Sequence, residues 1–213
     1  PDNCPRELIA PTGVLIDAKK RVFGYVMPFI DGQALDKLSK TSSVITPKFT
    51  ATLLTNLYDL VTALHARGIV IGDFNENNIL LVLEIPYLID ADSMQFGKYQ
   101  CRTFMPRFTA PELLKTKKIK SGKKRGGGEK TTTTQFSLAA PHNKLTDWYS
   151  FLVIAMRLLT FTDPYGGVIP GIDLAERIEK RLTVFNDKVI YPAIARPLIS
   201  VPHPILEVFF RTF

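Results

Sequence analysis

Apolar residues recur along part of the chain at a spacing that predicts a helix. Between Phe49 and Leu64 they stand three and four residues apart, so one face of a helix would be apolar. Thr46 and Pro47 supply an N-terminal cap and a first-turn proline, and Gly68 stands where a left-handed cap residue is expected. We therefore expect a helix of about five turns in this segment.

Shorter apolar runs predict four strands. Two lie near the N-terminus, at 14–16 and 22–27, on either side of a polar turn. Two more, at 79–83 and 87–89, are apolar at nearly every position, which is typical of strands that are buried on both faces. The pattern thus predicts one hairpin at the start of the chain and a second, buried hairpin further along.

Three later segments predict helices. Residues 147–159 are apolar nearly all round, so this helix should be central and buried. A polar helix is expected from Asp173 to about Leu182, and residues 205–213 begin another with apolar side chains at helical spacing.

The composition limits the class of protein. The chain has 213 residues, of which 46% are apolar, enough for one globular domain or two small lobes. Glu84 and Pro86 interrupt one apolar run and Arg157 interrupts another, so no membrane span is predicted. Cys4 and Cys101 cannot make a disulfide framework and favour a reducing compartment, so a cytoplasmic location is expected.

The net charge of +7 is concentrated in one segment. Residues 115–130 contain eight basic side chains and one acidic one, so the remainder of the chain is neutral and its core is not expected to bind nucleic acid. The run 115–135 is rich in lysine, glycine and threonine, which predicts a disordered insert. Two interpretations of its charge stay open: a solvated tether, and a docking patch for an acidic partner.

The candidate chemistry lies in residues 71–92, IGDFNENNILLVLEIPYLIDAD. Asp73 and Asn78 lie on a short polar loop, and Asp90 follows the second buried strand. Phosphoryl transfer needs a carboxylate that orients the attacking hydroxyl and oxygen ligands that hold magnesium on the phosphates. These three side chains supply that set of groups.

Four motifs in order make the chain resemble the protein-kinase-like superfamily. Residues 73–78 (DFNENN) are similar to the catalytic loop, and residues 88–92 (LIDAD) match the position of the Asp-Phe-Gly motif. Residues 108–112 (FTAPE) look like the end of the activation segment, and residues 147–150 (DWYS) resemble the start of the central C-lobe helix.

The resemblance implies an α+β, protein-kinase-like fold that is mainly a helical C-lobe. Residues 1–33 would hold a remnant of the β-rich N-lobe and the hinge. Residues 34–213 would form the C-lobe, incomplete at its C-terminus and interrupted by the insert at about 115–135.

The resemblance also implies roles in catalysis and metal binding. Asp73 would orient or deprotonate the acceptor hydroxyl. Asn75 stands two places later, where protein kinases usually carry a lysine, and is included with the catalytic residues. Asn78 and Asp90 would bind ATP through the Mg²⁺ that both ligate.

Further roles concern the nucleotide base and the scaffold. Met27 and Phe29 lie in a stretch similar to the hinge, where the backbone receives adenine. Glu112 would tie the activation segment to an arginine expected beyond Phe213. Asp147 would accept hydrogen bonds from the catalytic-loop backbone.

Departures from the kinase pattern keep three functions open. Ile71 and Gly72 replace the usual His-Arg pair, and the chain shows no glycine-rich loop and no Val-Ala-Ile-Lys strand. The first function is phosphorylation of a protein Ser or Thr by a divergent, bacterial-type kinase. The second is a pseudokinase that only binds partners, and the third is a small-molecule phosphotransferase of the aminoglycoside or choline kinase type. As it stands, the chain is expected to bind ATP weakly and to be inactive alone.

Overall fold

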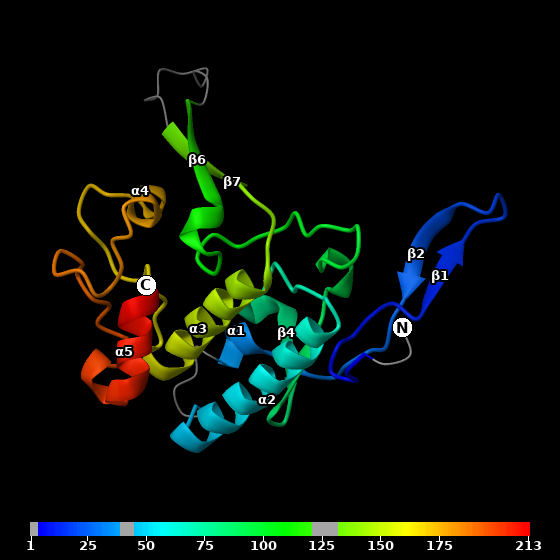
Figure 1. Ribbon diagram of the computed structural model, residues 1–213, viewed down its shortest axis with the longest axis horizontal. Helices are drawn as coiled ribbons and strands as arrows, with labels where there is room; N and C mark the ends of the chain where they lie inside the picture. The colour runs from blue at the N-terminus through cyan, green and yellow to red at the C-terminus, as the bar shows by residue number, and fades with distance from the viewer. Residues whose placement is uncertain (1–3, 39–44, 121–131) are drawn as a thin grey trace, which may run out of the picture.

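The computed structural model describes residues 4–38, 45–120 and 132–213, which form a mixed α+β structure (Figure 1). In chain order the strands and α-helices are β1 (Gly13–Ile16), β2 (Val22–Val26), β3 (Gln33–Ala34), α1 (Leu35–Leu38), α2 (Pro47–Ala66), β4 (Ile79–Val82), β5 (Ile85–Leu88), β6 (Leu114–Lys120), β7 (Thr132–Leu138), α3 (Lys144–Thr160), α4 (Leu174–Glu179) and α5 (His203–Thr212). Short 3₁₀ turns join some of them: η1 (Glu76–Asn78), η2 (Ala91–Ser93), η3 (Pro111–Leu113) and η4 (Leu198–Ser200).

Helix α2 forms where the apolar spacing predicted it. The side chain of Thr46 accepts a hydrogen bond from the Phe49 backbone N–H at 3.1 Å, and Pro47 occupies the first turn. Gly68 follows the helix with a φ of +74°, a conformation that glycine adopts without a steric penalty. The apolar face from Phe49 to Leu64 is buried, so this prediction is confirmed.

Helix α3 packs against α2 and completes the centre of the core. It begins at Lys144, earlier than the expected start at Asp147. The reason is a capping box, in which Asn143 and Thr146 each bond the backbone of the other. Side chains from both helices meet in one fully buried cluster, which includes Leu53, Leu57, Val61, Val153, Ile154 and Leu158.

A three-stranded antiparallel sheet, in the order β3-β4-β5, lies beside α2. Strands β4 and β5 form a hairpin whose turn includes Leu83, with a φ of +59°. The strands expected at 79–83 and 87–89 are therefore confirmed, although β4 ends at Val82 and β5 begins at Ile85. Their expected burial on both faces is wrong, because only alternate positions are buried and Leu83 in the turn is exposed. This hairpin joins the polar loop before β4 to the acidic turn after β5.

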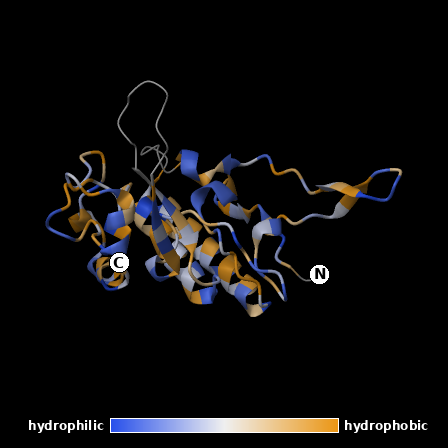
Figure 2. Cartoon of the chain, turned by 90° about the horizontal axis from the view of Figure 1, so that it is seen from above, coloured by the Kyte–Doolittle hydropathy of each residue, from blue (hydrophilic) through white to orange (hydrophobic). Residues whose placement is uncertain are grey.

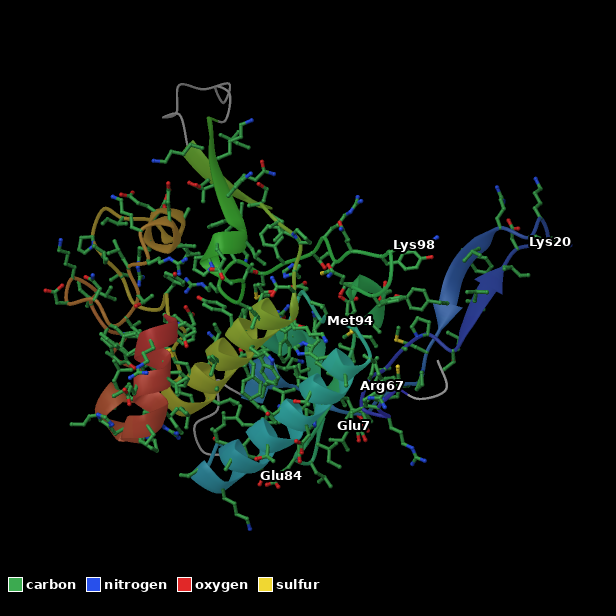
Figure 3. The ribbon with its side chains drawn as sticks, in the orientation of Figure 1. Glu7, Lys20, Arg67, Glu84, Met94 and Lys98 are labelled. Carbon is green, nitrogen blue, oxygen red and sulfur yellow. The ribbon has the colours of Figure 1, made fainter. Side chains whose placement is uncertain are left out.

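Strands β1 and β2 form an N-terminal hairpin that projects away from the helices (Figure 1). The strands expected at 14–16 and 22–27 are confirmed, and Lys20 marks the tip of the hairpin (Figure 3). Apolar side chains on the two strands, such as those of Val22 and Phe23, are largely exposed. Figure 2 shows hydrophobic stretches along this projecting hairpin.

The prediction of a disordered insert at 115–135 is wrong for its two ends, residues 115–120 and 132–135, which form strands. Strands β6 and β7 pair in antiparallel register, from Leu114 opposite Leu138 to Lys120 opposite Thr132, while residues 121–131 lie outside the described residues. Composition missed the ribbon because a Lys/Thr-rich run buries little, yet β-branched threonine suits extended backbone. Pairing between the two ends then satisfies their backbone groups.

The last helices sit at the far side of α3 from the N-terminal hairpin (Figure 1). The side chain of Asp173 accepts a hydrogen bond from the Glu176 N–H at 2.8 Å and caps α4, which lies beside the β6–β7 ribbon. Helix α5 begins at His203, slightly before the expected start at 205. Within the described ranges, no helix has the length and apolar character that crossing a membrane would require.

The shared core of α2 and α3 yields a stability prediction. Leu57 is fully buried, so Leu57→Ala should lower the free energy of unfolding by roughly 2–5 kcal/mol. Leu145 in α3 is 78% exposed, so the same truncation there should cost less than about 0.5 kcal/mol. Urea denaturation of both variants measures the difference, and equal losses would contradict this assignment of the core.

Candidate functional site

Asp147, in the first turn of α3, anchors the loop that precedes η1. Its fully buried carboxylate accepts hydrogen bonds from the backbone N–H groups of Ile71 at 2.8 Å and Gly72 at 2.9 Å. Nε2 of His65, from α2, lies 2.8 Å from the same carboxylate. The role expected for Asp147 is thus confirmed, and the bonds join both core helices to the loop.

Gly72 is packed too tightly to carry a side chain. Its φ is +76°, and a Cβ built there would stand 2.5 Å from the Cys101 Sγ. The Cys101 thiol lies beside Thr103 and His142. Burial alone would raise the pKa of this thiol, but bonds to His142 and Thr103 lower it overall. The glycine at this position is therefore a packing requirement of the loop.

Asp73 is half-buried on this loop, and two asparagines hold it in place. The Asn75 Nδ2 donates to the Asp73 Oδ1 at 2.9 Å and to the Asp73 backbone oxygen at 3.0 Å. The Asn78 Nδ2 donates to the same backbone oxygen at 2.9 Å. Asn75 itself is buried and holds the Asp73 carboxylate through these bonds, and its expected catalytic role stays a prediction.

The surroundings of Asp73 raise its pKa above the ordinary range. Burial is the largest cause, and the negative charge of Asp90 acts in the same direction. The hydrogen bond from Asn75 and the Met105 backbone oppose this shift. Burial and the charge of Asp92 likewise raise the pKa of Asp90. Asp73 therefore interacts with Asp90, and Asp90 with Asp92, although Asp73 lies on a different loop from the other two.

A cavity of about 500 Å³ lies between the N-terminal hairpin and the β4–β5 hairpin. All four residues expected to bind the nucleotide line it, namely Met27, Phe29, Asn78 and Asp90. The volume falls within the range of small-ligand sites. Its remaining lining residues are Ile9, Tyr25, Pro28, Ile30, Leu80, Ile89 and Asp92. One part of the cavity is thus apolar, and the other carries oxygen atoms.

The polar end of the cavity is shaped by the turn after β5. The Ile89 N–H donates to the Asn78 backbone oxygen at 3.0 Å, which brings the two chemistry-bearing turns together. Asp90 has a left-handed backbone, with φ +66° and ψ +38°, and Ser93 Oγ donates to its backbone oxygen at 2.9 Å. The Tyr25 hydroxyl lies 3.4 Å from the Asp92 carboxylate, so β2 meets this turn.

The donor set at this end suits a metal that is shared with phosphates. Amide and carboxylate oxygens are the ligands that Mg²⁺ prefers, and it commonly uses one or two carboxylates together with substrate phosphates. Within the described ranges, no group of three or more His, Cys, Asp or Glu side chains is placed to hold a metal by itself. Asn78 and Asp90 instead fit a site in which the protein supplies two oxygen ligands and the substrate phosphates supply others.

Sequence reasoning missed a buried chain of alternating charges behind the loop. Arg157 Nε in α3 lies 2.9 Å from Glu76 Oε1, and its Nη1 lies 3.4 Å from Asp163. Asp163 in turn holds Arg107 at 3.0 Å. Burial alone would lower the pKa of Arg157, but its bond to Glu76 and the nearby acids raise it overall. The available signal was Arg157 itself, a charge within an apolar helix that requires a buried partner.

Among the described residues, Glu112 has an ion-pair partner in Arg181, just after α4, at 3.5 Å. The arginine expected beyond Phe213 stays a prediction. Both side chains are largely exposed, and such a pair contributes little to stability.

Comparisons with known proteins leave the family of the chain open. No protein-family model matches it, and no curated protein is a significant match. Function must therefore be inferred from the side chains that meet around the cavity.

The packing of Gly72 yields a prediction with an internal control. Gly72→Ala should lower the free energy of unfolding by about 3 kcal/mol, because it adds a clash with Cys101 to the left-handed strain. Gly68 has a similar φ of +74° but open space around it, so Gly68→Ala should cost only about 1–2 kcal/mol. Urea denaturation of the two variants tests this, and equal costs would show that Cys101 does not restrict the loop.

The interactions of Asp73 predict shifts of opposite sign. Asp90→Asn should lower the pKa of Asp73, because it removes a negative charge that favours the protonated form. Asn75→Ala should raise that pKa further, because it removes a donor that favours the carboxylate. Carbon-13 NMR titration of the aspartate carboxyls measures both, with the exposed Asp59→Asn as a control. Shifts of the same sign in the two variants would contradict this arrangement.

Proposed function

We propose that this chain carries a phosphoryl-transfer site that uses ATP and magnesium and acts on a Ser or Thr hydroxyl of a protein. The observation that carries the proposal is the cavity whose polar end holds Asn78 and Asp90 and whose neighbour is Asp73. Metal ligands next to an orienting carboxylate are the groups that this reaction needs.

The cavity would divide the nucleotide between its two parts. The apolar part is lined by residues 27–30 and by Leu80 and Ile89, and it suits the flat adenine ring. At the polar end, Asn78 and Asp90 would hold magnesium, which when bound would neutralise charge on the phosphates.

Asp73 would act on the acceptor hydroxyl. Its raised pKa brings it closer to the range in which a carboxylate works as a general base, and its half-buried position leaves it reachable. Asn75 fixes the carboxylate, and Asp147 fixes the loop that carries it. Orientation of this kind supplies a large share of catalysis when reacting atoms are held in line.

The second candidate is a binding module without chemistry, and one observation favours it. Among the described residues that line the cavity, none is basic, so the phosphates would meet no positively charged side chain there. Nucleotide binding should then be weak and should depend on magnesium, because two carboxylates otherwise repel a triphosphate.

Calorimetry and labelled ATP together test the proposal. Wild type should bind ATP with magnesium and lose binding when the metal is chelated, and Asp90→Asn should weaken binding by roughly tenfold or more. Asp73→Asn should bind as wild type does but lower any transfer to mixed protein acceptors by roughly 10²–10⁴-fold. Asp59→Asn, exposed on α2, is the matched control.

The outcomes separate the candidates. Transfer by wild type above the level of Asp73→Asn supports the enzyme. Magnesium-dependent binding without transfer supports the binding module. ATP binding that is unchanged by chelation of the metal and by Asp90→Asn would overturn the proposal.

A further inference from the structure

A strip of positive charge runs along the chain from the segment beside Asp73 into β6. Residues 98–118 carry six basic side chains and one acidic one, which gives a net charge of six minus one, or +5. The basic residues are Lys98, Arg102, Arg107, Lys115, Lys117 and Lys118. All except Arg107 are exposed, whereas the Arg107 side chain is only partly exposed and pairs with Asp163. We call this set the basic strip.

The basic strip begins next to the candidate catalytic loop. Cys101 packs against Gly72, and the Met105 backbone interacts with the Asp73 carboxylate, so the 98–107 segment borders Asp73. Lys98, labelled in Figure 3, lies on this segment. The chain then continues through η3 into the ribbon that stands out from the body in Figure 1. A polypeptide acceptor at Asp73 would therefore meet the strip.

The lysines of strand β6 have different neighbours on the ribbon and around α4. Lys118 and Thr134 share a groove with the acids of α4, and Thr134 Oγ1 lies 3.3 Å from Asp173. Lys115 and Lys117 alternate with these positions and pair across the ribbon with uncharged Ser137 and Gln135. At the base of the ribbon, Lys115 also lines a groove with Glu179 and Arg181. Neither lysine has an acidic residue opposite it on β7.

Strand β6 also has an open edge. In the described part of the chain the β6–β7 sheet has two strands, so the outer edge of each is unpaired. An extended peptide can add to such an edge through its backbone, with alternate side chains on one face. Lys115 and Lys117 stand two residues apart on one face, so acidic residues at alternate positions would meet them.

We infer that the basic strip and the open edge of β6 bind an extended acidic segment of the protein substrate. This rests on the proposed function for the identity of the partner as the acceptor. A peptide is favoured over nucleic acid because only a peptide can pair with the strand edge.

Fluorescence anisotropy with two labelled peptides tests the inference on the full chain. Both contain one serine, and one carries glutamate at alternate positions where the other carries glutamine. The acidic peptide should bind roughly tenfold tighter. The double variant Lys115→Glu/Lys117→Glu should remove that advantage, and Lys115→Gln/Lys117→Gln should reduce it, with circular dichroism confirming that the fold is kept.

A matched control variant and a second anionic ligand provide the results that could contradict the inference. Lys48→Glu/Lys188→Glu changes the same charge at exposed positions outside the strip, so it should keep the advantage. Equal binding of the two peptides, or equal loss in the control, would overturn the inference. A single-stranded oligonucleotide of equal charge that binds as tightly, with the same dependence on Lys115 and Lys117, would overturn it in favour of nucleic acid.

The titration contains no ATP, so its result is independent of the phosphoryl-transfer proposal. A chain that prefers the acidic peptide but fails to bind ATP with magnesium keeps the docking surface and loses the proposed reaction. A chain that binds ATP through Asp90 but shows no peptide preference does the reverse.

Discussion

The buried carboxylate of Asp147 is the constraint on which the site depends. It lies at the start of the central helix α3 and receives the two backbone N–H groups before Asp73, while His65 from α2 contacts it as well. A hydrogen bond to an ionised group stabilises by roughly 1.5–3 kcal/mol, and a buried acid without partners would be costly. The two core helices therefore fix the loop that carries Asp73.

The rest of the site follows from one hairpin. Asn78 precedes β4 and Asp90 follows β5, so antiparallel pairing of these strands returns the chain to its starting point. A hydrogen bond from the Ile89 N–H to the Asn78 backbone oxygen joins the two ends of the hairpin. The 27–30 segment then covers the apolar side of the same cavity. Strand pairing thus brings Asn78 and Asp90 to the same cavity, and the proposed chemistry requires both side chains there.

Much of this arrangement could be predicted from the sequence where the signal was local. Helix α2 has its cap, its spacing and its terminal glycine in one continuous segment, and the anchoring role of Asp147 followed from motif order. The β6–β7 ribbon could not be predicted, because it depends on pairing between two ends of a low-complexity run. The hydrogen bond from Asn75 to the Asp73 carboxylate could not be predicted either, because residue spacing does not reveal which side-chain atoms meet.

The convergence of Asn78 and Asp90 on one cation is the central claim, and paramagnetic NMR tests it most directly. Mn²⁺ can replace Mg²⁺ at oxygen ligands and broadens the resonances of nearby nuclei. Titration of the chain with Mn²⁺ and a non-hydrolysable ATP analogue should first broaden the Asn78 side-chain amide and the backbone signals around Asp90. Broadening centred elsewhere, for example on the exposed acids of α4 or α5, would contradict the account.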